Sequence, residues 1–257
     1  MNQKSKEKLR YLIAFAIAYI LLNFIPFKFF MEELPYLIFR LASYLLLMAL
    51  ALVFKYKREI EIPVPPKTLS HLLILPFVIP CFADIFYAVI FEAEFNVSFN
   101  WMVLSLETVI DLFDSIVEDV VFVDVMISFL LDYMKDDEKH NLHAMLISSA
   151  IFTLIRTYVF IYYDFDDAIF NLVVTFLITF GCGYLAIYYA SEWIPIVFHF
   201  LFNVPNFVIA PILFNYETEL EYYLFISIFI VPLFCYTLFM YFMSERRLHR
   251  HSKEKLR

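Results

Sequence analysis

Glycine is almost absent from this chain, and its scarcity excludes one class of sites. Only Gly181 and Gly183 occur in 257 residues. Phosphate-binding loops need several glycines close together, because their backbone must approach the phosphate. The sequence therefore predicts no nucleotide cradle and no cofactor, and we expect the two glycines to permit close contact between helices.

Cysteine is scarce as well, and nucleic-acid-binding motifs are missing. Cys81, Cys182 and Cys235 each lie in an apolar stretch, without metal-ligand spacing or the pattern of a disulfide framework. We expect them to pack as small hydrophobic side chains, and we expect no metal site. Nucleic acid is not an expected partner.

Apolar side chains are what the chain has in abundance. Hydrophobic residues make up 63% of the sequence, and the mean hydropathy is +0.75, whereas soluble domains are roughly 45–50% apolar. The aromatic content of 20% suits contact with lipid and with the membrane interface. The composition predicts an all-α, polytopic transmembrane helical bundle in contact with the lipid bilayer.

Apolar runs long enough to cross roughly 30 Å of hydrocarbon recur along the chain. The run 101–134 is too long for one upright span, so it either tilts strongly or begins as an amphipathic approach. About eight spans are expected, at residues 11–30, 34–54, 71–91, 101–134, 143–163, 168–190, 194–214 and 222–243. They form a single multipass domain over residues 1–257.

The distribution of charge predicts the orientation. Residues 1–10, the loop 55–70 and the C-terminal tail are rich in Lys and Arg, whereas the opposite loops are acidic. Basic segments stay in the cytoplasm, and an even number of spans places both ends on one side. We therefore expect cytoplasmic N- and C-termini and a location in the cell membrane, which is the cytoplasmic membrane in a prokaryote.

Carboxylates inside the apolar run 101–134 are the most unusual feature of the sequence. Glu107, Asp111, Asp114 and Glu118 follow one another at intervals of four, three and four residues, which places them on one helical face. Asp119 adjoins Glu118. A carboxylate in hydrocarbon is costly, so such residues usually face a bundle interior or a water-filled cavity and mark a function.

Three polar residues on later apolar segments are the expected partners. His199 and Asn203 share a helical face, where they could stabilise an oxyanion or form an interhelical hydrogen bond. Arg156 lies too deep in its segment to reach the interface easily, so it needs a carboxylate. Glu118 and Asp119 could then serve as a general base that activates water or as a structural ion-pair partner of Arg156.

These residues together resemble the CAAX protease and bacteriocin-processing family of intramembrane endopeptidases, which includes the type II CAAX prenyl proteases. Members carry Glu-Glu-x-x-x-Arg, Phe-x-x-x-His and His-x-x-x-Asn motifs, in that order and on separate transmembrane helices. The chain has EDVVFVD at residues 118–124, FTLIR at 152–156 and HFLFN at 199–203. The resemblance covers a core of about residues 101–214 and implies catalytic positions at Glu118, Asp119, His199 and Asn203.

The departures from these motifs fall on catalytic positions. Asp119 is a conservative replacement of the second Glu, but Val123 stands where the family has Arg. Asp124 replaces the usual Gly, and Arg156 stands where the family has a catalytic His. A guanidinium cannot shuttle protons as an imidazole does. We expect Arg156 to pair with Glu118 or Asp119. The positive charge that the family carries at position 123 would then come from position 156 instead.

Three functional hypotheses follow from this pattern. The first is a family-type membrane protein with lost or altered endopeptidase activity, which binds other membrane proteins or peptides as a scaffold or regulator. The second is an active intramembrane endopeptidase with Glu118 as base and with His199 and Asn203 as oxyanion stabilisers. The third is a transporter that uses the acidic helical face as a proton or cation path.

Overall fold

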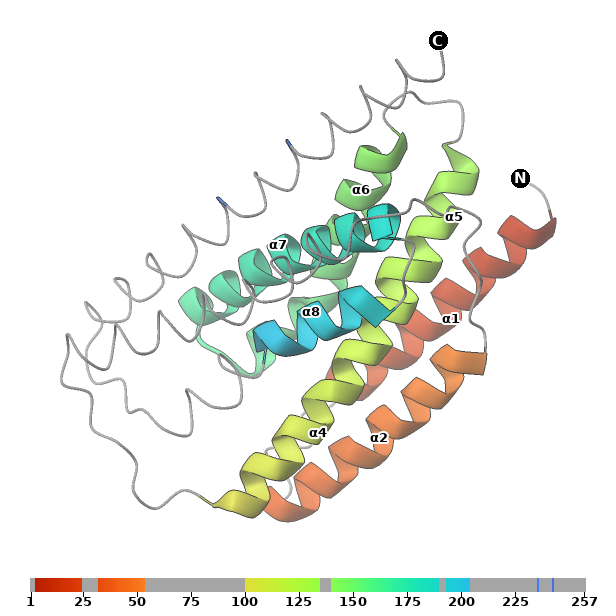
Figure 1. Cartoon of the computed structure of the whole chain (residues 1–257). Helices are drawn as coiled ribbons and strands as arrows, with labels where there is room; N and C mark the ends of the chain where they lie inside the picture. The colour runs from red at the N-terminus through yellow and green to blue at the C-terminus, as the bar shows by residue number, and fades with distance from the viewer. Residues whose placement is uncertain are drawn as a thin grey trace, which may run out of the picture.

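The computed structural model describes residues 3–24, 32–53, 100–134, 140–189 and 193–203, together with Cys235 and Phe242. All elements within these residues are helical, in agreement with the predicted all-α class (Figure 1). They are α1 (Gln3–Phe24), α2 (Glu33–Val53), α4 (Trp101–Glu118), a π-helical segment (Asp119–Val125), α5 (Met126–Tyr133), α6 (His140–Ile155), a 3₁₀ segment (Arg156–Ile161), α7 (Phe165–Tyr189) and α8 (Trp193–Asn203).

Part of the predicted membrane topology can be compared with these helices. Three stretches are long and apolar enough to cross a membrane, namely Leu34–Ala51, His140–Ile161 and Phe165–Ile187. They match the spans expected at 34–54, 143–163 and 168–190, as a multipass membrane protein requires. The spans expected at 11–30 and 101–134 fall largely on described helices but are not among these three stretches. The span at 71–91, most of that at 222–243 and the second half of 194–214 lie outside the described residues, so the eight spans and the cytoplasmic termini stay predictions.

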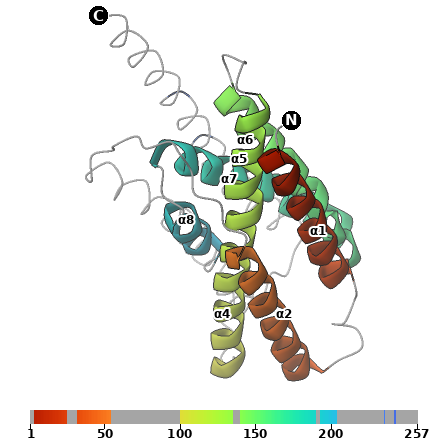
Figure 2. The same cartoon turned by 90° about the vertical axis from the view of Figure 1, so that its right-hand side faces the viewer.

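The helix predicted over 101–134 is one continuous helical rod with a change of winding in its middle. The segments α4, Asp119–Val125 and α5 follow one another without a break, which Figures 1 and 2 show from two sides. A π-helix is rare and is frequently found at functional sites. Here it begins at Asp119, directly after Glu118, and the Phe122 carbonyl within it accepts a hydrogen bond from the Ser148 hydroxyl of α6.

Helix α1 begins within the predicted basic head rather than after it. Lys8 is only 3% accessible, and its ammonium lies 2.8 Å from the Asp132 carboxylate and 2.7 Å from the Ser128 hydroxyl of α5. A buried lysine needs such partners. This interaction ties the start of α1 to the end of α5, and it explains why the helix extends through the charged residues.

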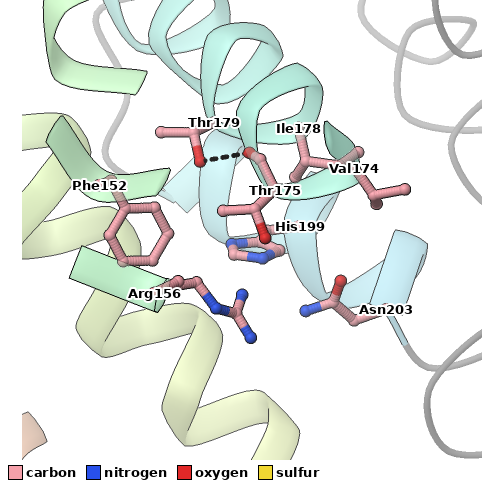
Figure 3. A pocket seen from close by; sticks show the side chains of 8 residues that line it. All are labelled: Phe152, Arg156, Val174, Thr175, Ile178, Thr179, His199 and Asn203. Atoms are coloured by element: carbon pink, nitrogen blue, oxygen red, sulfur yellow. Dashed lines mark hydrogen bonds between the residues drawn. The ribbon is translucent and has the colours of Figure 1, made fainter. Parts of the chain in front are cut away.

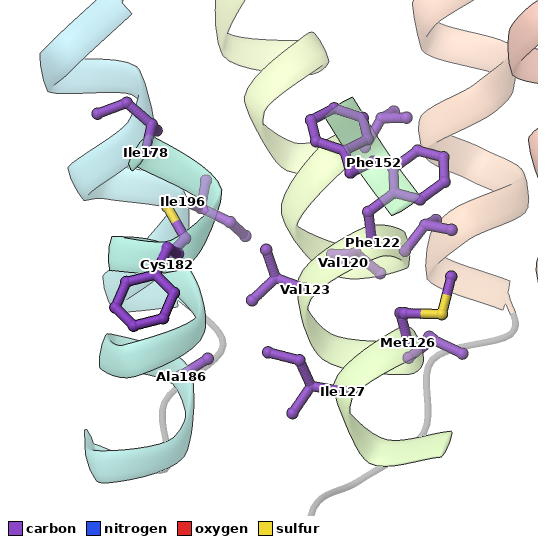
Figure 4. Close-up of a cluster of buried hydrophobic side chains, with 14 of the residues drawn as sticks. Val120, Phe122, Val123, Met126, Ile127, Phe152, Ile178, Cys182, Ala186 and Ile196 are labelled. Carbon is purple, nitrogen blue, oxygen red and sulfur yellow. The ribbon is translucent and has the colours of Figure 1, made fainter. Parts of the chain in front are cut away.

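Aromatic rings fill the core where α1, the π-helical segment and α6 meet. The Phe122 and Phe152 rings are stacked, with centroids 4.6 Å apart (Figure 4). The Tyr19 ring meets Phe122 edge-on at 5.5 Å. All three side chains are less than 2% accessible. Such pairs add about 0.5–1.5 kcal/mol each beyond the burial of their surface, so they help to fix the irregular segment in place.

Gly183 lies where α7 closely approaches α5 and α6. A Cβ atom at this position would lie 3.1 Å from Ile127 Cδ1 and 3.2 Å from Met145 Cγ. Both distances are shorter than ordinary van der Waals contact. The expected role of this glycine in close helix contact is therefore confirmed.

A Gly183→Leu substitution should overpack this contact and destabilise the protein by about 1–3 kcal/mol. Gly183→Ala should change the stability by no more than about 1 kcal/mol, because alanine favours the helix by a similar amount and the two neighbouring side chains can yield slightly. Thermal unfolding of both variants in detergent measures the difference. Equal losses for the two variants would contradict this account of the contact.

Candidate functional site

Four helical elements bring the residues of the predicted site together. Glu118 ends α4, Asp119 begins the π-helical segment, Arg156 begins the 3₁₀ segment, and His199 and Asn203 lie on α8. Glu118 is 1% accessible, Asp119 2% and His199 3%. Residues up to 85 positions apart in the sequence thus form one enclosed polar cluster. Their catalytic roles stay predictions.

Glu118 lies at the centre of this cluster. Arg156 Nη1 is 3.5 Å from Glu118 Oε2, and the Tyr19 hydroxyl donates a hydrogen bond of 2.5 Å to Glu118 Oε1. The guanidinium of Arg156 also lies over the Phe152 ring, 5.8 Å from its centroid. Of the two carboxylates expected to pair with Arg156, the ion pair is with Glu118.

His199 lies between two carboxylates that are adjacent in the sequence. Its Nε2 is 3.6 Å from Glu118 Oε2, and its Nδ1 is 3.4 Å from Asp119 Oδ2. Each nitrogen of the ring therefore faces one carboxylate. This arrangement fixes the orientation of the imidazole and makes its two nitrogens chemically distinct.

A small cavity borders the cluster on the side of α7. Figure 3 shows the Arg156 guanidinium and the side chains of His199 and Asn203 converging on it. Its volume is about 10 Å³, close to the space of one water molecule. The lining residues are Phe152, Arg156, Val174, Thr175, Ile178, Thr179, His199 and Asn203.

Tyr19 of α1 belongs to the site but was not predicted from the sequence. Its side chain is fully buried, and its hydroxyl lies 3.4 Å from that of Tyr158 in addition to its bond to Glu118. The only sequence signal is a tyrosine in an aliphatic run, whose hydroxyl needs a partner when buried. That signal does not reveal which partner it meets.

The acidic face of α4 points into the protein, as its spacing predicted. Arg40 of α2 donates to Glu107 at 3.1 Å, and Asp111 interacts with the side chain of Asn203. Asp114 is buried at 9% accessibility. Among the described residues, both ends of this carboxylate row are ion-paired, so the row is not a line of free acids. The transport hypothesis stays a prediction.

Val123 lies on the side of the π-helical segment that faces α7. It is 1% accessible, and Figure 4 shows it directed towards α7, where Cys182 and Ala186 lie. An apolar residue therefore occupies the position four residues after Asp119 on the same rod. Asp124, which is 4% accessible, follows it within the π-helical segment.

Replacing Arg156 with methionine should destabilise the protein by about 3–5 kcal/mol, because the buried charge of Glu118 would lose its partner. The Glu118→Gln/Arg156→Met double variant should recover much of this loss, since neither charge then remains unpaired. Thermal unfolding of both single variants and the double variant in detergent measures the coupling. Additive losses would show that the two side chains do not interact.

Comparison with known proteins bears on this site. A family model described as type II CAAX prenyl endopeptidase Rce1-like matches residues 65–205, which is more than half of the chain and includes the whole predicted site. No curated protein and no solved structure matches the chain. The three motifs lie in order, and the site residues gather in one buried cluster. The chain belongs to the Rce1-like family of type II CAAX prenyl endopeptidases.

Proposed function

We propose that this member of the family has lost endopeptidase activity at Glu118 and acts as a membrane scaffold or regulator that binds other membrane proteins or peptides. The pairing of Glu118 with Arg156, at 3.5 Å, is the observation that supports this proposal. The carboxylate that a protease would use as its base is here held by a guanidinium.

A general base must accept a proton from a water molecule beside it. One oxygen of Glu118 accepts a hydrogen bond from Tyr19, and the other faces both Arg156 and His199. These contacts favour a structural role for Glu118 over a role in activating water.

Arg156 also changes what the cavity can do. It lines the cavity opposite His199 and Asn203 (Figure 3), at the position where the resemblance leads us to expect an imidazole. A guanidinium stays protonated in proteins and cannot relay a proton to a leaving amine. The proton relay is therefore impaired.

An active endopeptidase is the second candidate, and one observation favours it. His199 Nε2 lies 3.6 Å from Glu118 Oε2, and Asn203 borders the same cavity. If Arg156 moved away when a substrate bound, Glu118 and His199 would remain together as a base and an oxyanion stabiliser. This candidate requires every cleavage to depend on Glu118.

Mass spectrometry of protein termini in whole membranes tests the proposal without a known substrate. Cells that produce the wild type should show no terminus that is lost in Glu118→Gln, because Glu118 does not act as a base. The Glu118→Gln/Arg156→Met double variant, in which neither charge of the pair remains unpaired, should complement a deletion strain as well as the wild type does, since a binding role does not need the base.

Glu107→Gln is the matched control, because Glu107 is a carboxylate of the same helix that pairs with Arg40 instead of Arg156. A terminus found with the wild type and with Glu107→Gln, but missing with Glu118→Gln, would establish an active endopeptidase and overturn the proposal.

A further inference from the structure

Three donor side chains converge beside the Glu118–Arg156 pair. Asp119 of the π-helical segment, Cys182 of α7 and His199 of α8 each offer one ligand atom, and these atoms lie within 4.8 Å of one another. All three residues are at most 3% accessible. Figure 4 shows Cys182 beside Ile196 of α8 and across from Val123 of the segment that carries Asp119.

Two of these donor atoms make no hydrogen bond. Asp119 Oδ2 and His199 Nδ1 are buried without a hydrogen-bond partner among the described residues, and their 3.4 Å separation is that of a long contact between the two groups. The thiol of Cys182 has a weak contact with the Pro195 carbonyl at 3.8 Å. A buried carboxylate needs a compensating charge. Arg156 pairs with Glu118, so beside Asp119 that charge comes either from a protonated His199 or from a bound cation.

We propose that Asp119 Oδ2, Cys182 Sγ and His199 Nδ1 bind a zinc ion. A thiolate, an imidazole and a carboxylate are the ligands that Zn²⁺ takes in proteins, and a water molecule can complete four-coordination. Magnesium and calcium are disfavoured, because they prefer oxygen ligands. Cys182 binds as a thiolate and its proton passes to water, so the two charges of the ion balance those of the thiolate and of Asp119.

The surroundings of His199 match those of a metal ligand. Histidines that bind metal through one ring nitrogen generally direct the other ring N–H at a carboxylate or carbonyl, which fixes the tautomer and the ring orientation. His199 Nε2 faces Glu118, whose orientation is in turn fixed by Tyr19 and Arg156. The Glu118–Arg156 pair would thus position a metal ligand.

Such a site would hold together three elements that are distant in the sequence. Asp119, Cys182 and His199 show none of the short spacings by which metal sites are detected from sequence, and for this reason Cys182 was expected only to pack as an apolar side chain. The proposal does not depend on the loss of hydrolysis at Glu118, since the site forms from other atoms.

Metal content and cobalt substitution test the site directly. The full chain, purified in detergent without chelators or a histidine tag, should contain close to one zinc ion per chain by mass spectrometry. After removal of zinc, added Co²⁺ should produce the near-ultraviolet charge-transfer absorption of a cobalt–thiolate bond. Cys182→Ser should abolish this absorption, and Asp119→Asn should weaken Co²⁺ binding by more than about tenfold.

Cys235→Ser is the matched control, because Cys235 is a free, exposed cysteine that is not one of the three donors. It should retain both the zinc and the absorption. Absence of both zinc and the cobalt–thiolate band in the wild type would overturn the proposal, whether or not Cys182→Ser folds. So would a band that Cys235→Ser removes and Cys182→Ser keeps. Neither result would bear on cleavage at Glu118, which is measured separately.

Discussion

The burial of the Glu118 charge is the constraint on which the rest of the site depends. A carboxylate with 1% accessibility inside an apolar bundle must be compensated by its neighbours. The compensation comes from three separate elements: Tyr19 on α1, Arg156 after α6 and His199 on α8. Satisfying one charge therefore brings together helices from most of the described chain.

The change to π-helical winding at Asp119 is the second constraint. It lies in the middle of a rod of roughly 50 Å, at 1.5 Å per residue, between α4, which carries the row of carboxylates, and α5, which carries Asp132. Ser148 supplies a hydrogen bond to the irregular backbone, and stacked Phe122 and Phe152 rings support it. In this family member, the irregular segment directs Asp119 towards His199 while Glu118 remains with Arg156.

Membership of an endopeptidase family does not by itself establish peptide hydrolysis here. The motif residues follow one another in the family order and lie in one buried cluster, whereas Arg156 stands where the resemblance leads us to expect a histidine. A guanidinium brings a permanent positive charge to a place where proton transfer needs a neutral, exchangeable group. The proposed binding role rests on these two features: the motif residues remain clustered, and Arg156 adds a permanent charge to the cluster.

The sequence by itself determined the helical class, the membrane character and five residues that the structure brings into one cluster, because hydropathy and motif spacing are local properties of the chain. It also predicted that Arg156 would seek a carboxylate. Only the tertiary structure decided that the carboxylate is Glu118, that Tyr19 and buried Lys8 find their partners on distant helices, and that Cys182 lies beside Asp119 and His199. Those contacts depend on how helices pack, and packing joins residues whose separation in the sequence carries no signal.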